Sequence, residues 1–130
     1  MKETVEKYVA IWNSNDIANL EEILSEKSDY WDATQAGDAK DVLKNAVTST
    51  YNAFSDISFE IVSLKADGKN QFFLEWQMTG TNTGSFFGYP PTGKYIKIPG
   101  LDSIKIESGK ISKIKSFYDS SLFMQQLGLQ

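Results

Sequence analysis

The chain has 130 residues, 41% of them hydrophobic, and 13 basic against 17 acidic side chains give a net charge of −4. This composition supports one hydrophobic core and excludes a disordered chain. The acidic balance argues against a nucleic-acid or membrane partner. Cys and His are absent, and every basic residue is Lys. Disulfides, thiol nucleophiles, the Ser-His-Asp triad and the usual zinc sites are therefore excluded, and we expect no metal or cofactor.

The N-terminal residues are charged and lead into no apolar run, so they do not resemble a signal peptide. No stretch approaches the roughly 18 apolar residues of a membrane span. We expect a soluble cytoplasmic protein.

In the first half of the chain, apolar residues at helical spacing predict helices. A first helix covers residues 5–12, and the polar residues 13–16 end it. A second, shorter apolar stripe covers 17–24. Residues 29–32 form a short extended piece, and a third helix covers 37–54.

From residue 57 the apolar period changes to two, which is typical of strands. The predicted strands are 57–64, 71–79, 95–107 and 110–118. Asp67-Gly68 and Ser108-Gly109 predict tight turns, and Pro99-Gly100 predicts a bulge or bend within the third strand. A short helix over 119–127 closes the chain.

Helices followed by hairpin-linked strands indicate an α+β fold with an antiparallel sheet. We expect the sheet to bend strongly, with the three N-terminal helices across its concave side and a pocket between them. The Gly/Pro-rich loop 84–93 is expected at the rim of that pocket.

Several short motifs together resemble the SnoaL-like polyketide cyclases of the NTF2-like superfamily. They are Tyr8 to Asn13, Asp32, Glu75-Trp76, Gly80 to Gly84, Phe86, Gly88, Pro90 to Lys94, Pro99 to Asp102, Gly109 to Ile111, Tyr118-Asp119 and Gln126 to Leu129. The resemblance runs nearly end to end, so it implies a single domain over residues 1–130.

This resemblance implies a cone-shaped α+β barrel that encloses an apolar pocket for a small apolar molecule. It also implies a homodimer formed through the outer face of the sheet. Characterised cyclases of this family close an aromatic polyketide ring by intramolecular aldol condensation, without metal or cofactor. Their acid/base aspartate corresponds to Asp119. Asn82 and Lys115 stand where many relatives carry His and Trp.

Asp119 and Asp102 are the candidate catalytic carboxyls. Asp119 is the first candidate for the base, but it also directly precedes a helix, where Asp is a favoured N-cap. Asp102 shares the strand parity of Ile104 and Ile106, which points it toward the apolar face. A bulge at Pro99-Gly100 would instead shift the phase and leave Asp102 at the surface.

Six further residues are candidate substrate contacts: Trp12, Trp31, Asp32, Phe86, Tyr89 and Tyr118. The aromatic rings could stack on a planar ligand, although core packing is the simpler interpretation for Trp12. Tyr118 could donate a hydrogen bond to an enolate. Asp32 could reach the pocket mouth or lie in a surface turn.

The leading hypothesis is a cofactor-free cyclase or isomerase. Water activation by an Asp pair, a carrier or sensor of a small apolar ligand, and a dimerisation module are the alternatives. Fold alone cannot choose between them. A pocket containing an inward carboxyl favours an enzyme, a pocket without one favours a binder, and a collapsed cavity favours an interaction module.

Overall fold

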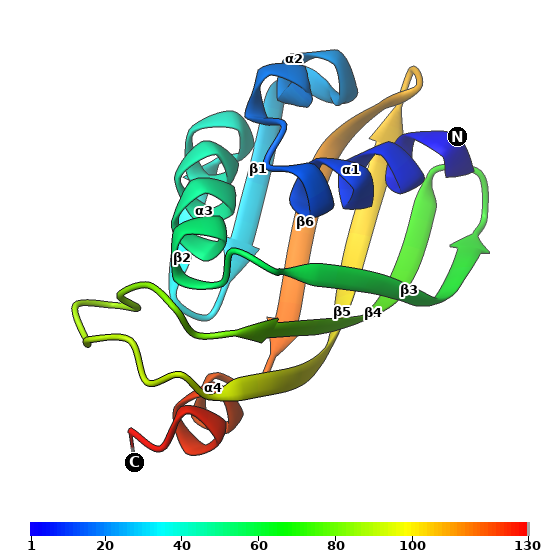
Figure 1. Cartoon of the computed structure of the whole chain (residues 1–130). Coiled ribbons are helices and arrows are strands. Elements are labelled where there is room, and N and C mark those ends of the chain that lie inside the picture. The colour runs from blue at the N-terminus through cyan, green and yellow to red at the C-terminus, as the bar shows by residue number, and fades with distance from the viewer. Residues whose placement is uncertain (130) are drawn as a thin grey trace.

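Residues 1–129 are described by a computed structural model of the chain (Figure 1). The elements in chain order are α1 (Lys2–Ser14), the 3-10 helix η1 (Ile17–Asn19), α2 (Leu20–Ile23), β1 (Leu24–Asp32), β2 (Gln35–Asp38), α3 (Ala39–Ala53), β3 (Ser58–Asp67), β4 (Gln71–Thr81), β5 (Tyr95–Glu107), β6 (Lys110–Tyr118) and α4 (Ser120–Leu127). Within residues 1–129, no helix is long and apolar enough to cross a lipid bilayer.

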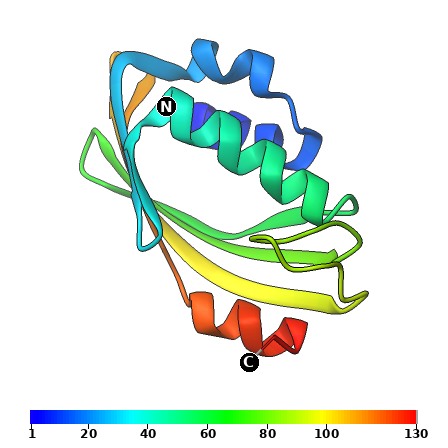
Figure 2. The same cartoon turned by 90° about the vertical axis from the view of Figure 1, so that its left-hand side faces the viewer.

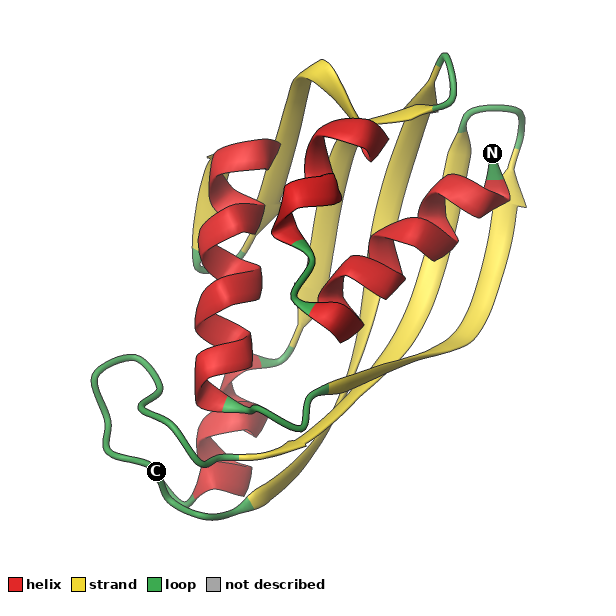
Figure 3. Ribbon diagram, turned by 45° about the horizontal axis from the view of Figure 1, so that its top comes forward, coloured by secondary structure: helices red, strands yellow, loops and turns green. Residues whose placement is uncertain are grey.

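The six strands form one curved sheet in the order β2-β1-β6-β5-β4-β3. The helices α1, α2 and α3 lie across its concave face, and α4 packs at the end of the sheet where β6 finishes (Figures 2 and 3). This arrangement confirms the predicted α+β class. The sheet remains open within the described residues, because β2 and β3 are its two edges and do not pair with each other.

The prediction of an all-antiparallel sheet is wrong at one pair. β1 and β6 run parallel, while the other neighbouring strands are antiparallel. Parallel strands need a long connection, and here most of the chain lies between the two partners. The short extended piece predicted at residues 29–32 is the end of a strand that already begins at Leu24, so the second helix stops one residue earlier than predicted.

The bulge predicted at Pro99-Gly100 is absent. β4 and β5 stay in unbroken register from Gln71↔Lys105 to Thr81↔Tyr95, with Gly100 opposite Trp76. Pro99 lies just beyond the last pairing of β5 with β6, where its missing N–H removes no bond on that side. Strand alternation therefore continues through the dipeptide and points Asp102 toward the concave face.

The hydrophobic core lies between the helices and the concave face of the sheet. It contains fully buried side chains from both layers, among them Val5, Leu43, Val47, Ile96, Ile98, Ile104 and Ile114. Asp38 begins α3 as its N-cap, accepting a hydrogen bond from the Asp41 N–H at 3.1 Å. This cap fixes where α3 starts, and α3 forms one wall of the cavity described next.

Candidate functional site

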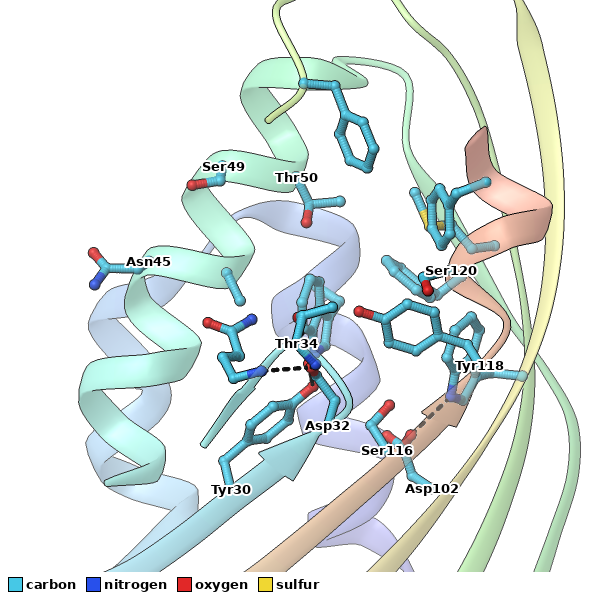
Figure 4. Close-up of a pocket in the computed structure, with 18 of the residues that line it drawn as sticks. Tyr30, Asp32, Thr34, Asn45, Ser49, Thr50, Asp102, Ser116, Tyr118 and Ser120 are labelled. Atoms are coloured by element: carbon cyan, nitrogen blue, oxygen red, sulfur yellow. Dashed lines mark hydrogen bonds between the residues drawn. The ribbon is translucent and has the colours of Figure 1, made fainter. Parts of the chain in front are cut away.

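A cavity of about 800 Å³ lies between α1, α3 and the concave face of the sheet (Figure 4). The loop 82–94 and α4 complete its wall. Its volume is in the range of cavities that hold small organic ligands of several rings. Two carboxyl groups face into it, and they are the only charged side chains among the lining residues that the structure describes: Asp32 and Asp102.

Asp102 lies on β5 and is only 4% exposed. Trp76 Nε1 donates a hydrogen bond to Asp102 Oδ1 at 3.0 Å, and the Ser116 hydroxyl lies beside the same carboxyl (Figure 4). Burial raises the pKa of Asp102 to about 6, the charge of Asp32 also raises it, and Ser116 and Trp76 partly oppose that rise. A carboxyl that titrates near neutral pH can both accept and return a proton.

Asp32 lies at the end of β1 and is 3% exposed. It accepts four hydrogen bonds: from Tyr30 Oη at 2.9 Å, Thr34 N at 2.7 Å, Thr34 Oγ1 at 2.7 Å and Gln35 N at 3.1 Å. The side chain therefore closes the turn between β1 and β2 and also lines the cavity. Asp32 thus has both of the roles considered for it, a turn residue and a residue of the pocket. Because both oxygens are engaged, Asp32 is a weaker candidate for a base than Asp102.

Three tyrosines face the same end of the cavity: Tyr8 from α1, Tyr30 from β1 and Tyr118 from β6. Burial raises the pKa of each phenol, and the charges of Asp32 and Asp102 raise it further. The three hydroxyls therefore keep their protons at neutral pH. Tyr30 already donates a hydrogen bond to Asp32, so Tyr8 and Tyr118 are the two phenols whose O–H groups could serve an oxyanion formed in this cavity.

Aromatic rings form the remaining walls. Phe59 lies between Trp12 and Trp76, with ring centroids 5.1 and 5.5 Å away. Phe86 lies 5.5 Å from Phe54 and stacks on Phe123 at 5.7 Å. These tilted and stacked surfaces suit a planar apolar ligand.

Asn82 holds the loop that carries Phe86. The residue is fully buried, and its Nδ2 donates hydrogen bonds to the Ala53 carbonyl at 3.2 Å and the Gly84 carbonyl at 2.8 Å. Its Oδ1 accepts bonds from Thr92 N at 2.8 Å and Thr92 Oγ1 at 3.0 Å. The amide thus ties both ends of the loop to the end of α3, which is a structural role for Asn82.

The structure does not place Asp119 in the cavity wall, and this placement gives no support to the prediction that it is the base. Its side chain is exposed and is not among the lining residues. Asp119 Oδ1 accepts hydrogen bonds from Ser121 N at 2.9 Å and Leu122 N at 3.3 Å, so it caps the N-terminus of α4. This is the N-cap role that its position directly before a helix predicts.

The structure brings Asp102, Asp32, Trp12, Phe86 and Tyr118 together in one cavity. Trp31 and Tyr89 do not join them, and the prediction that they contact substrate is not supported by their placement. Trp31 is 41% exposed and packs against Phe117 with ring centroids 5.5 Å apart. Strand alternation explains this, because Tyr30 and Asp32 face inward and the residue between them faces outward. Tyr89 is 43% exposed in loop 82–94.

Many residues of the cavity wall were not predicted as site residues from the sequence, and those nearest the two carboxyl groups include Tyr8, Tyr30, Thr34 and Ser116. Strand alternation could have indicated two of them. Tyr30 lies on the same strand face as Asp32, and Ser116 lies on the same face as Ile114. Tyr8 belongs to the apolar stripe of the first helix, which by itself indicates only packing. Within residues 1–129, no group of three His, Cys, Asp or Glu side chains is arranged to hold a metal ion.

Comparison with solved structures shows the same fold in several proteins. TsrD from Streptomyces laurentii has a TM-score of 0.87 at 19% identity, covering 98% of this chain and 94% of that one. IdmH, a candidate polyketide cyclase from Streptomyces antibioticus, has a TM-score of 0.82 at 20% identity, covering 97% and 96%. AclR, a candidate hydroxylase from Streptomyces galilaeus, has a TM-score of 0.86 at 21% identity, covering 99% and 81%.

At these identities the solved structures establish the fold alone, which is the NTF2-like fold. No curated protein matches the sequence significantly. The family comparison is more specific, because the signature of the SnoaL-like polyketide cyclases matches residues 2–127. The chain belongs to the SnoaL-like polyketide cyclase family.

Proposed function

We propose that the protein is a cofactor-free cyclase or isomerase in which Asp102 moves a proton at a carbon next to a carbonyl group. The observation that carries the proposal is a buried carboxyl with a pKa of about 6, facing a cavity and surrounded by hydroxyl donors. A base in a water-poor site with such a pKa is suited to proton transfer at neutral pH. Family membership supports the same type of reaction.

In this mechanism the Asp102 carboxylate takes a proton from the carbon next to a substrate carbonyl. The electron pair of the broken C–H bond moves into the carbonyl group and forms an enolate. Tyr8 and Tyr118 line the same cavity, and in this mechanism their hydroxyl groups donate hydrogen bonds to the enolate oxygen. Stabilising that charge lowers the barrier to proton removal.

The enolate then has two outcomes. In a cyclisation, its carbon attacks a second carbonyl of the same molecule, a C–C bond forms, and the new alkoxide takes the proton back from Asp102. In an isomerisation, Asp102 returns the proton to a different carbon. Both outcomes regenerate the Asp102 carboxylate without an oxidant, reductant or metal.

The cavity also supports a substrate class. Its walls are largely aromatic and aliphatic, and its volume admits several fused rings, as in a polyketide- or steroid-like molecule. No Lys lies among the described lining residues, so no cation is available there to pair with a ligand carboxylate or phosphate. We therefore favour an uncharged apolar substrate.

The same geometry weighs against the other hypotheses. Water activation by the Asp pair would require two free carboxyls, whereas Asp32 already accepts four hydrogen bonds. A collapsed interaction module would lack a cavity of this size. A non-catalytic carrier remains the alternative that the following experiment separates from an enzyme.

The test uses 2-tetralone, an apolar bicyclic ketone, in D₂O. Exchange of its α-hydrogens for deuterium, followed by NMR, requires only a base and enolate stabilisation. We expect the wild-type protein to accelerate exchange over buffer, and Asp102→Asn to reduce that rate by a factor on the order of 10²–10⁴. Asp119→Asn is the matched control, because Asn caps a helix as well as Asp does. If Asp102→Asn exchanges the hydrogens at the wild-type rate, the proposed enzymatic role of Asp102 is refuted and the carrier hypothesis replaces it.

A further inference from the structure

Gly100 occupies a position that has no space for a side chain. It lies on β5 directly opposite Trp76 of β4. A Cβ atom added to Gly100 would fall 2.0 Å from Trp76 Cζ2 and 2.3 Å from Cε2. Gly100 is not among the glycines with positive φ, so its backbone conformation would accept other residues. The three atoms nearest to such a Cβ all belong to the indole ring, so the ring accounts for the requirement for glycine here.

The indole ring uses this space to reach Asp102. Asp102 is paired with Leu74, two residues away from the Trp76↔Gly100 pair, so Trp76 can contact it only along a diagonal. The ring passes over Gly100 and places Nε1 3.0 Å from Asp102 Oδ1. Phe59 at 5.5 Å and Tyr118 at 6.2 Å pack against the ring and hold it there.

We propose that Gly100 is a positioning residue, whose missing side chain leaves the gap through which the Trp76 indole crosses β5 and holds the Asp102 carboxyl for proton transfer. The catalytic part of this statement rests on the proposed function. Packing of an aromatic ring over a glycine also stabilises a sheet without any chemistry. The two explanations differ because only positioning depends on the indole N–H.

The groups around Asp102 define what the loss of this contact does. Asp32 faces it from β1, and the charge of Asp32 raises the pKa of Asp102. Tyr8 from α1 lines the same cavity and is uncharged at neutral pH, because burial and the charge of Asp102 raise the pKa of its phenol. Trp76 from β4 and Ser116 from β6 stabilise the carboxylate and lower its pKa. Loss or displacement of the indole donor therefore raises the pKa of Asp102 further.

The first experiment measures the pKa of Asp102 by carboxyl ¹³C NMR. Trp76→Phe keeps an aromatic ring but deletes the donor, and we expect the pKa to rise by about one pH unit. Gly100→Ala keeps the donor but displaces it, and we expect a rise in the same direction. The control is Gly80→Ala on β4, where the new Cβ would meet Phe54 Cβ at 3.1 Å and leave Trp76 untouched. An unchanged pKa in Trp76→Phe would overturn the proposal.

A second experiment still tests the proposal if the Gly100→Ala variant alone does not fold. Trp76→Leu removes the ring atoms that the added methyl group would strike, so adding Gly100→Ala to Trp76→Leu should change neither the thermal midpoint nor the pKa of Asp102. In the wild-type background the same change should lower the midpoint by roughly 5–15 °C through overpacking. An equal loss in both backgrounds would show that Gly100 is needed for a reason unrelated to Trp76.

These readouts need no substrate, so they fail independently of the proposed function. If 2-tetralone exchange does not depend on Asp102 while both expectations hold, Gly100 still positions the carboxyl and the enzymatic role is lost. If exchange depends on Asp102 but Trp76→Phe leaves its pKa and its pH profile unchanged, the base stands and the positioning role of Gly100 is refuted.

Discussion

Replacing Asp102 by Asn should stabilise the protein at neutral pH while removing the proposed proton transfer. Asn has the same shape as Asp, and its Oδ1 can still accept the hydrogen bond from Trp76. It has no charge to bury. A residue kept for function at the expense of stability is expected to behave in this way.

The size of the effect follows from the pKa of Asp102. Its value of about 6 in the folded protein lies about two units above the ordinary 3.8. Each unit corresponds to about 1.4 kcal/mol, so the buried charge costs about 3 kcal/mol of folding free energy once the group is ionised in both states. Between pH 4 and pH 6 the folded state binds more protons than the unfolded state, so stability falls with rising pH. Above pH 6 this contribution is constant.

Urea unfolding followed by tryptophan fluorescence measures this difference. We expect Asp102→Asn to exceed the wild type by about 2–3 kcal/mol at pH 8 and by close to zero at pH 4. Asp119→Asn controls for the loss of one negative charge, since it keeps the helix cap. A gain of equal size at both pH values, or a loss at pH 8, would refute the assignment of Asp102 as a buried carboxyl of raised pKa.

Two further predictions concern the loop and the outer face of the sheet. Asn82→Ala should lower the free energy of unfolding by about 2–4 kcal/mol, because it leaves buried partners of the amide without hydrogen bonds. A loss under about 1 kcal/mol in urea unfolding would contradict the role of Asn82 in holding the loop to α3. Trp31, Leu101 and Phe117 are exposed on the outer face, and we predict a two-fold dimer through it. Sedimentation should show twice the 14.6 kDa chain mass and Phe117→Lys should shift it to the monomer, whereas a monomeric wild type would contradict the dimer.

Local patterns were sufficient for most of the fold. The predicted strands 95–107 and 110–118 match β5 and β6 residue for residue, because period-two alternation and Gly-containing turns act over short distances. β2 was missed because its four residues are all exposed and show no apolar pattern. The parallel pairing of β1 with β6 joins segments about 85 residues apart, and no local signal encodes it.

The candidate site also has features that a local pattern indicates and features that it does not. The sequence left two orientations of Asp102 open: inward by alternation with Ile104 and Ile106, or outward if a bulge at Pro99-Gly100 shifted the phase. The inward orientation holds, because β5 keeps its register with β4 through that dipeptide. For Asp119 the position before a helix predicts an N-cap and the family motif predicts a catalytic carboxyl; the structure shows the cap, with an exposed side chain. The position of Tyr8 in the cavity wall could not be predicted, because an apolar stripe on a helix does not distinguish a core residue from one that lines a cavity.

The most direct test of the central claim is the pH dependence of 2-tetralone exchange. If Asp102 is the base, the protein-catalysed rate should rise with pH and reach half its maximum near pH 6, where that carboxyl ionises. This rise should be absent in Asp102→Asn and retained in Asp119→Asn. A wild-type profile with its midpoint near pH 4, the ordinary value of an exposed aspartate, would contradict the account and exclude a buried carboxyl as the group that takes the proton.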